Sequence, residues 1–481
     1  MDLSTENKQS GISLNKKTIA LICILLVGIM AFAGVLTQIM PRGIYDLDEN
    51  GSIINGTYRE IEDKMPIWKI FLAPILLFGS ETSLTGLAII LFIVIIGGTF
   101  LILDKCSVLK YIMAVVINKF GNRKYLLLNS MIFICMLLSS TAGILEESVT
   151  LVPITVAISL ALGWDSFVGL CISLVSIAFG FTAATFNPFN VVTVQKMAGI
   201  PIFSGLGYRI IVFLVIYLVL AGFVTLYAKK IEKNPRKSLC YETDIALREK
   251  YRLDDSIAII NDKQISKAAK AFLFCLLGVL AGIILDFILG TEGMVSLPCM
   301  AILFFTGGLL AGYFSGLRGK NLFRSFGEGI KTVAPIIPLI LIILAITYIL
   351  DEGSIIPTIL NFVYNLIQNL SPYSAILILF VFIVILEFFI GSGTAKAFLI
   401  MPLVLPLAEM VGVSAQSVTL AFCFGDGFTN LLYPTSGIMI IAIGLVNITY
   451  GKWLKFSWKL FLLEGIVSVA LMLTAIAINY R

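Results

Sequence analysis

Two adjacent glutamates, Glu146 and Glu147, stand inside the apolar stretch GILEESVTLVP at residues 143–153. At the centre of a bilayer an ionised carboxylate costs about 2.5–3.5 kcal/mol on insertion scales, so such a residue needs a partner or a function. Consecutive helical residues point about 100° apart, and only one of the two can face a cavity squarely. We predict that at least one glutamate contacts a ligand or carries a proton; the alternative is that both only cap a turn near water.

Three further ionisable residues, Glu387, Lys396 and Asp426, lie in the C-terminal part of the chain. Glycines on both sides of Asp426 let a ligand or ion approach the backbone closely. We therefore expect Asp426 to bind a substrate or an ion, and we name sodium near Gly393 and Asp426 as one candidate. Lys396 aligns with Glu147 when the two halves of the chain are compared, so an ion pair between them and a substrate contact both stay open. Glu387 is a second potential partner of Lys396.

Uncharged polar residues gather where proline interrupts two apolar segments, in FNPFN at 186–190 and LYPTSG at 432–437. Proline removes a backbone donor and breaks a helix, and the freed backbone groups must then face protein, water or a ligand. The candidate substrate-binding residues of this kind are Asn187, Asn190, Ser392, Thr394, Asn430, Thr435 and Ser436. The candidate hinge residues are Gly143, Pro188, Gly391, Gly393, Gly425, Gly427 and Pro434. The alternative for each amide or hydroxyl is that it only patches a broken helix.

The composition indicates a polytopic membrane protein. Of the 481 residues 59% are hydrophobic and 13% are charged, whereas about a quarter are charged in a soluble domain. The chain has no histidine, and its eight cysteines show no CxxC spacing, which excludes a His-ligated metal and disfavours a membrane enzyme. We predict no cofactor. The net charge of +5 is read as membrane orientation and not as a nucleic-acid footprint.

Loop charges predict the topology. The lysine-bearing N-terminus is predicted to be cytoplasmic and the acidic segment 41–65 to be outside. The amphipathic stretch 104–124 is expected to lie flat on the inner surface. A basic segment at 229–267 reads as a cytoplasmic, partly helical linker between membrane halves at 1–228 and 268–481. Asp104, Asp286 and Glu464 are placed near span ends, where charges usually reach water.

The two halves share a pattern of prolines and glycines. In the segments 143–164 and 392–413, Pro153 falls on Pro402 and Gly163 on Gly412. Arms too short to span comfortably predict re-entrant hairpins at about 126–163 and 373–411. Each is followed by a proline-broken membrane helix, at about 166–200 and 415–447. The predicted fold is an all-α polytopic membrane protein with two inverted-topology repeats, the layout of many secondary transporters.

The pairing of GILEES with FNPFNVVTVQKMAGIP, and of GSGTAKAF with AFCFGDGFTNLLYPTS, resembles the YfcC-type transporters. These belong to the C4-dicarboxylate anaerobic carrier group of the ion transporter superfamily. The resemblance covers most of the chain and implies inverted repeats, a homodimer formed through a scaffold domain, and elevator-like alternating access. Superfamily members carry Ser-Asn-Thr at each hairpin tip. Residues 391–394 keep part of this pattern and residues 143–146 do not.

We therefore predict a secondary active transporter of the cytoplasmic membrane for a small carboxylate-bearing metabolite. No pore-like ring repeat favours a channel, and no nucleotide-binding motif is present, so the driving force is a counter-substrate or a Na⁺ or H⁺ gradient. Near the proposed cavity four acids (Glu146, Glu147, Glu387 and Asp426) face one base, Lys396. This favours an amino acid, with arginine or ornithine as basic candidates. The alternatives are a C4-dicarboxylate transporter and a sodium/proton antiporter.

Overall fold

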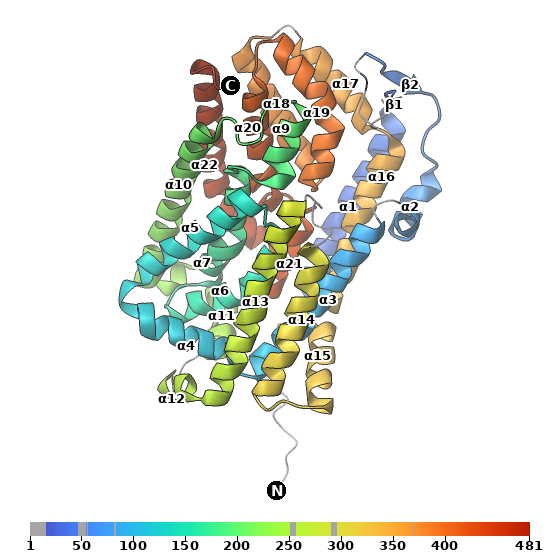
Figure 1. Cartoon of the computed structure of the whole chain (residues 1–481). Helices are drawn as coiled ribbons and strands as arrows, with labels where there is room; N and C mark the ends of the chain where they lie inside the picture. Colours follow the sequence, from blue (N-terminus) through green and yellow to red (C-terminus); the bar gives the residue numbers. More distant parts are fainter. Residues whose placement is uncertain are drawn as a thin grey trace.

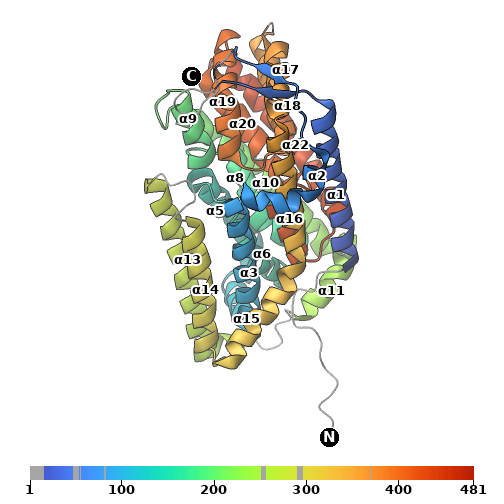
Figure 2. The ribbon, with the colours of Figure 1, turned by 90° about the vertical axis from the view of Figure 1, so that its right-hand side faces the viewer.

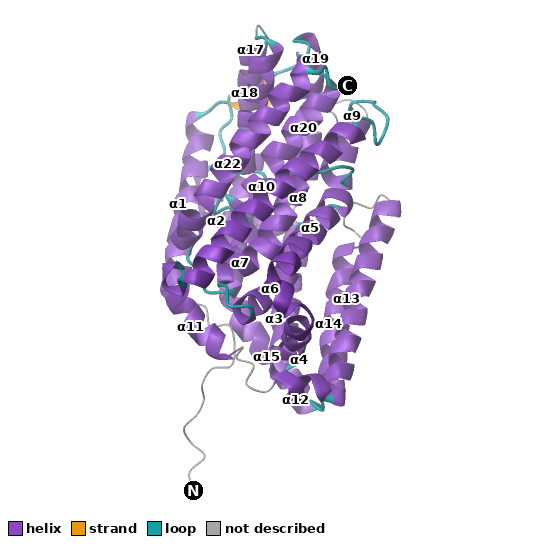
Figure 3. Ribbon diagram, turned by 90° about the vertical axis from the view of Figure 1, so that its left-hand side faces the viewer, coloured by secondary structure: helices purple, strands orange, loops and turns teal. Residues whose placement is uncertain are grey.

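The computed structural model describes residues 16–46, 54, 56–80, 83–250, 256–289, 296–368 and 370–481. This part of the chain is almost wholly helical (Figure 3). Its one sheet is an antiparallel pair of short strands, β1 (Arg42–Ile44) and β2 (Arg59–Ile61). Six helical segments of the described residues are long and apolar enough to cross a membrane: Ala20–Ile39, Val108–Ala142, Leu206–Lys233, Lys320–Gly353, Gly393–Met410 and Tyr450–Ala477.

The helices of the first half, in chain order, are α1 (Lys16–Ile39), α2 (Ile67–Leu76), η1 (Leu77–Gly79), α3 (Ser83–Lys105), α4 (Val108–Phe120), η2 (Gly121–Arg123), α5 (Lys124–Ala142), α6 (Ser148–Ala161), α7 (Ser166–Leu170), η3 (Cys171–Val175), α8 (Ser176–Thr182), η4 (Pro188–Val192), α9 (Thr193–Met197) and α10 (Leu206–Lys233). The linker region holds η5 (Pro235–Lys237), α11 (Tyr241–Lys250) and α12 (Ser256–Asn261).

The helices of the second half are α13 (Lys263–Leu289), α14 (Ser296–Phe314), α15 (Lys320–Val333), η6 (Ala334–Ile336), α16 (Ile337–Gly353), α17 (Ile356–Ile367), α18 (Pro372–Glu387), α19 (Gly393–Met410), α20 (Ala415–Asp426), η7 (Phe428–Leu431), α21 (Gly437–Leu445) and α22 (Tyr450–Ala477).

The segments with basic and acidic loops lie at opposite ends of the molecule. Figure 1 places α4, α11, α12 and α15 at one end, and β1, β2 and α17 at the other. The predicted inner segments 104–124 and 229–267 thus share one end, and the acidic segment 41–65 lies at the opposite end. α4 runs across this first end (Figure 1), and α13 and α14 pack together beside the bundle (Figure 2).

Two helical hairpins approach the middle of the molecule from opposite ends. α5 and α6 lie toward the end that carries α4, whereas α18 and α19 come from the end that carries α17 (Figures 1 and 2). In the first hairpin, Gly143 ends α5 with a left-handed φ of 74°, a conformation that favours glycine. In the second, Ser392 caps α19 by accepting a hydrogen bond from Ala395 N (3.3 Å).

An interrupted segment follows each hairpin and forms the core of the bundle. After the first hairpin, α7, η3 and α8 stop at Thr182 and η4 begins at Pro188. After the second, α20 stops at Asp426 and α21 begins at Gly437. Every described residue from Asp165 to Thr185 and from Gln416 to Leu431 is buried or nearly so. The two interruptions therefore lie deep in the protein, where the backbone groups that they free need partners.

The position of Glu464 within its helix differs from the one predicted from the sequence. This residue was placed near a span end, but α22 runs from Tyr450 to Ala477 and puts Glu464 in its middle. Its side chain is fully buried, because α22 packs against α10, α18 and α20. Ser468 Oγ donates a hydrogen bond to Glu464 Oε1 (3.4 Å). Within the described residues, Glu464 Oε2 has no hydrogen-bond partner.

Candidate functional site

The first hairpin tip is built directly on the first interruption. Asn187 Oδ1 accepts a hydrogen bond from Phe189 N (2.8 Å) and so caps η4, while its Nδ2 donates to Ser139 O (3.2 Å) at the end of α5. A Cβ added at Gly143 would lie 2.7 Å from Asn187 Oδ1. Asn190 Nδ2 reaches back across the interruption to Phe181 O (3.2 Å). The two asparagines thus hold the broken backbone together.

The second tip and the second interruption have a parallel arrangement. A Cβ added at Gly393 would lie 2.6 Å from Asp426 Oδ2, so glycine allows the tip to approach the end of α20. Asn430 Nδ2 donates to Asp426 O, and Thr435 Oγ1 donates to Phe388 O (2.8 Å). Ser436 Oγ caps α21 by accepting from Met439 N (3.4 Å). These neutral side chains are engaged with the backbone.

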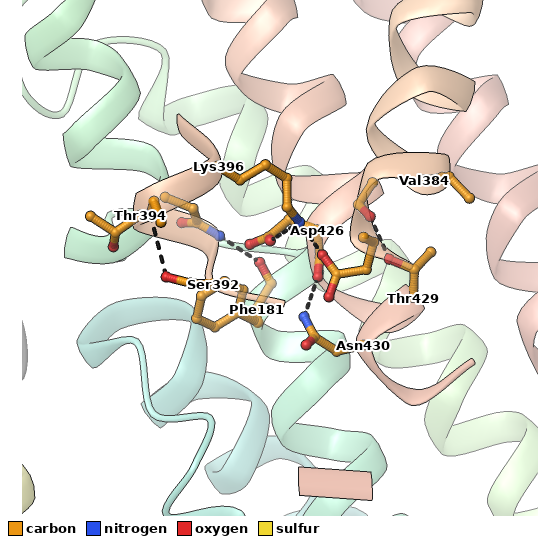
Figure 4. Close-up of polar contacts among 12 residues, drawn as sticks. Phe181, Val384, Ser392, Thr394, Lys396, Asp426, Thr429 and Asn430 are labelled. Carbon is orange, nitrogen blue, oxygen red and sulfur yellow. Dashed lines mark hydrogen bonds and ion pairs between the residues drawn. The ribbon is translucent and has the colours of Figure 1, made fainter. Parts of the chain in front are cut away.

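A buried charge cluster joins the second hairpin to α20 (Figure 4). Lys396 donates to Glu387 Oε2 and to Asp426 Oδ1, the second at 2.7 Å, and all three side chains are at most 1% exposed. In the part of the chain that the structure describes, the two ion pairs of Lys396 form within the second half, with Glu387 and Asp426. Among the described residues, Asp426 Oδ2 has no hydrogen-bond partner.

The two glutamates of the first tip have different surroundings. Glu147 Oε2 accepts a hydrogen bond from Leu145 N (3.1 Å), and this folds its side chain onto the tip. The Glu146 side chain, by contrast, is exposed. The carboxylates of Glu146 and Asp426 repel one another electrostatically. Glu146 therefore belongs to the same charged region as the Lys396 cluster.

The two halves meet at the interruptions. Thr394 Oγ1, one residue into α19, donates to Phe189 O (3.3 Å) in η4. Gly427 at the end of α20 lies against Thr182 at the end of α8, where an added Cβ would come within 2.5 Å of Thr182 Cα. Both tips and both broken helices thus converge on one region.

Two polar residues of this region, Arg209 and Ser148, were not predicted from the sequence. Arg209 on α10 is 1% exposed and lies against Ala184 and Cys423, close to both interruptions. Arg209 is the one charged residue between Lys196 and Lys229. A charge in an apolar segment is costly, and this signal, which applies to Glu146 and Glu147, also identifies Arg209. Ser148, at the start of α6, has a buried Oγ without a partner in the described part of the chain. Serine is too common in apolar helices to give a signal.

A bundle of apolar membrane-length helices, with buried charges at two broken helices, defines a membrane transport protein. The chain belongs to the C4-dicarboxylate anaerobic carrier (DcuC) family, whose model matches residues 19–477.

The chain is also similar to individual proteins and to a solved structure. The chain is 30% identical over 411 residues to the Escherichia coli protein named "Putative basic amino acid antiporter YfcC", covering 82% of this chain and 79% of that one. It is 25% identical over 378 residues to an uncharacterized protein of Haemophilus influenzae, covering 78% and 73%. The crystal structure of the Alcanivorax borkumensis YdaH transporter aligns with 96% of this chain and 98% of that one, at 16% identity and a TM-score of 0.44.

Proposed function

We propose that this protein is a secondary active transporter that exchanges basic amino acids, such as arginine and ornithine, across the cytoplasmic membrane. The observation that carries the proposal is an excess of negative charge in the interior. Glu387 and Asp426 both contact the ammonium group of Lys396, and Glu146 adds a third negative charge near Asp426. Even with the guanidinium of Arg209, about one turn of α20 away, three carboxylates face only two cations. A buried carboxylate without a counter-charge is costly, so the site favours a ligand that brings positive charge.

The geometry suggests where such a ligand binds. Its cationic group would meet Asp426 Oδ2, which has no partner in the described residues, and Glu146, whose side chain is exposed. The hairpins and the interrupted helices would move as one unit in an elevator-like cycle. This movement would let the substrate bind on one side of the membrane and be released on the other. A homodimer and two inverted repeats are part of this proposal, as is an orientation with the end that carries α4 and α11 in the cytoplasm. The E. coli relative named as a basic amino acid antiporter supports the substrate class.

Two alternatives have their own support. A C4-dicarboxylate is favoured by the family description and by the buried guanidinium of Arg209 near the interruptions. A sodium/proton antiporter would use Asp426 and its neighbours to bind Na⁺ or H⁺ and would need no metabolite. If no second amino acid is carried in the opposite direction, the proposed coupling ion is Na⁺ or H⁺.

Uptake into proteoliposomes tests these functions. We expect external labelled arginine to enter vesicles loaded with ornithine faster than empty vesicles. Asp426→Asn should lower this uptake at least about tenfold, because tenfold corresponds to 1.4 kcal/mol and a bond to a charged group contributes about 1.5–3 kcal/mol. Glu409→Gln, at an exposed carboxylate on α19, is the matched control. Competition by succinate or fumarate but not by arginine or ornithine would identify a dicarboxylate carrier, and Na⁺-driven proton flux without any metabolite would identify the antiporter.

A further inference from the structure

The guanidinium of Arg209 is buried beside both interrupted helices and is only partly used. Nη1 donates to Ala184 O (3.3 Å), just beyond α8, and lies 3.9 Å from Cys423 Sγ on α20. Nε and Nη2 have no hydrogen-bond partner in the described part of the chain. Tyr480 lies beside the guanidinium, which interacts electrostatically with its hydroxyl oxygen, and this hydroxyl donates its proton to Gly205 O (2.8 Å).

A structural role accounts for only one side of this group. A cation near the C-terminal end of a helix is favourable, and Nη1 meets a carbonyl that follows α8. Nε and Nη2 point away along the other edge of the planar guanidinium. This edge is the one that binds the two oxygens of a carboxylate side by side. Buried polar groups almost always have partners, so two unpartnered donors on one edge call for an explanation.

The position of this edge relative to the acidic cluster is informative. Cys423, which contacts Arg209, precedes Asp426 by three residues on α20, a rise of about 5 Å along the helix. A cationic region and an anionic region therefore lie about one helical turn apart. A basic amino acid carries both complementary groups on one molecule, an α-carboxylate and a cationic side chain.

We propose that the Nε–Nη2 edge of Arg209 is a carboxylate-binding site that takes the α-carboxylate of the transported amino acid. This inference rests on the proposed function and adds the group that distinguishes an amino acid from a simple amine. This edge is buried in the structure, so binding of a carboxylate requires the protein around Nε and Nη2 to move apart.

Comparing arginine with agmatine, which is arginine without its carboxylate, tests the proposal. We would measure binding of both to the purified full-length protein in lipid nanodiscs. Wild type should bind arginine at least about tenfold more tightly than agmatine, since charge-assisted bonds contribute about 1.5–3 kcal/mol and tenfold is 1.4 kcal/mol. Arg209→Gln should remove this preference by weakening arginine alone. Arg42→Gln, at a half-buried and peripheral guanidinium that contacts Asp63 O and Glu352 O, should leave the preference unchanged.

Arg209→Lys keeps the charge but lacks the flat edge, and it carries the test if Arg209→Gln does not fold. It should weaken arginine several-fold and leave agmatine within about twofold, as expected from the loss of one bidentate contact. Equal weakening of both ligands, or no change in either, would show a purely structural role and overturn the proposal. If wild type binds succinate and no basic amino acid, the proposed function fails. Loss of succinate binding in Arg209→Gln would then still support a carboxylate site, and unchanged succinate binding would refute it.

Discussion

At the scale of single residues, neighbouring carboxylates of one tip have unequal roles. Glu147 accepts a hydrogen bond from Leu145 N, whereas the Glu146 side chain is exposed and its charge interacts with that of Asp426. We therefore expect Glu146→Gln to lower arginine uptake at least about tenfold, the loss of one charged contact, and Glu147→Gln to lower it less than about threefold. Uptake by equal amounts of reconstituted protein is the measurement. The reverse order would assign the ligand contact to Glu147.

Glu464 allows a prediction about stability. A buried carboxylate with an unpartnered oxygen destabilises the folded protein, and an amide of the same shape carries no charge. Glu464→Gln should raise the midpoint of thermal unfolding in detergent by the equivalent of about 1 kcal/mol. Ser468→Ala, which removes the one hydroxyl that donates to Glu464, should lower it. A lower midpoint in Glu464→Gln would show that the carboxylate stabilises the bundle.

At the scale of elements, the contact between the two interrupted helices depends on a missing side chain. A methyl group at Gly427 would come within 2.5 Å of Thr182 Cα, and backbone atoms cannot move aside cheaply. Gly427→Ala should therefore abolish uptake or assembly. Gly391→Ala is the control, since a Cβ there meets nothing within 4 Å. Normal uptake by Gly427→Ala would show that the two ends separate easily.

The linker helix α11 is fastened to the turn that precedes α7. Asp244, fully buried, accepts hydrogen bonds from Ser166 N (2.9 Å) and Ser166 Oγ (2.5 Å). Arg248 donates to Trp164 O (2.5 Å). Asp165 accepts from the hydroxyls of Tyr227 and Ser238, both at 2.6 Å. The linker thus holds the base of the first interrupted helix, which the sequence alone did not indicate.

This attachment should depend on pH. Burial raises the pKa of Asp244 to about 6, from its ordinary value of 3.8, and the hydrogen bonds from Ser166 lower it only in part. A carboxyl whose pKa is raised on docking favours docking below the ordinary pKa, and the benefit disappears as the pH rises through 6. Nearby Asp165 adds to the increase and Arg248 opposes it.

Hydrogen exchange measures this dependence. Protection factors of residues 241–250, corrected for intrinsic exchange rates, should be higher at pH 5.5 than at pH 7.5. Asp244→Asn should reduce the difference, because the amide does not titrate. Glu242→Gln, at an exposed position of α11, should leave it unchanged. Equal protection of wild type at both pH values would contradict the prediction.

At the scale of the whole molecule, orientation can be tested with single cysteines. The native Cys240 cannot serve as a labelling site, because it is fully buried. Lys237 and Arg59 are exposed and lie in segments at opposite ends. With the partly exposed Cys23 and Cys299 replaced by serine, Lys237→Cys should react only with reagents that enter the cytoplasm. Arg59→Cys should react with impermeant reagents from outside, and the opposite pattern would invert the topology.

Much of the architecture can be predicted from the sequence, because the length of an apolar segment and the position of a proline determine the helix locally. η4 begins at Pro188, Pro434 lies between η7 and α21, and Asn187 and Ser436 are capping residues by type. The partners of Lys396 could not be derived, since they depend on how two hairpin arms and α20 pack together. The burial of Glu464 also depends on neighbouring helices, and its sequence position alone suggested the opposite.

The hydrogen bond from Thr394 to Phe189 O has a kinetic consequence. It ties the tip of one half to the broken helix of the other, and any cycle that parts them must break it once in each turnover. A net hydrogen bond contributes about 0.5–1.5 kcal/mol, which changes a rate by roughly two- to tenfold. The bond therefore slows opening without blocking it. Thr394→Val, which keeps the shape and removes the donor, should exchange substrate faster than wild type if this parting limits turnover.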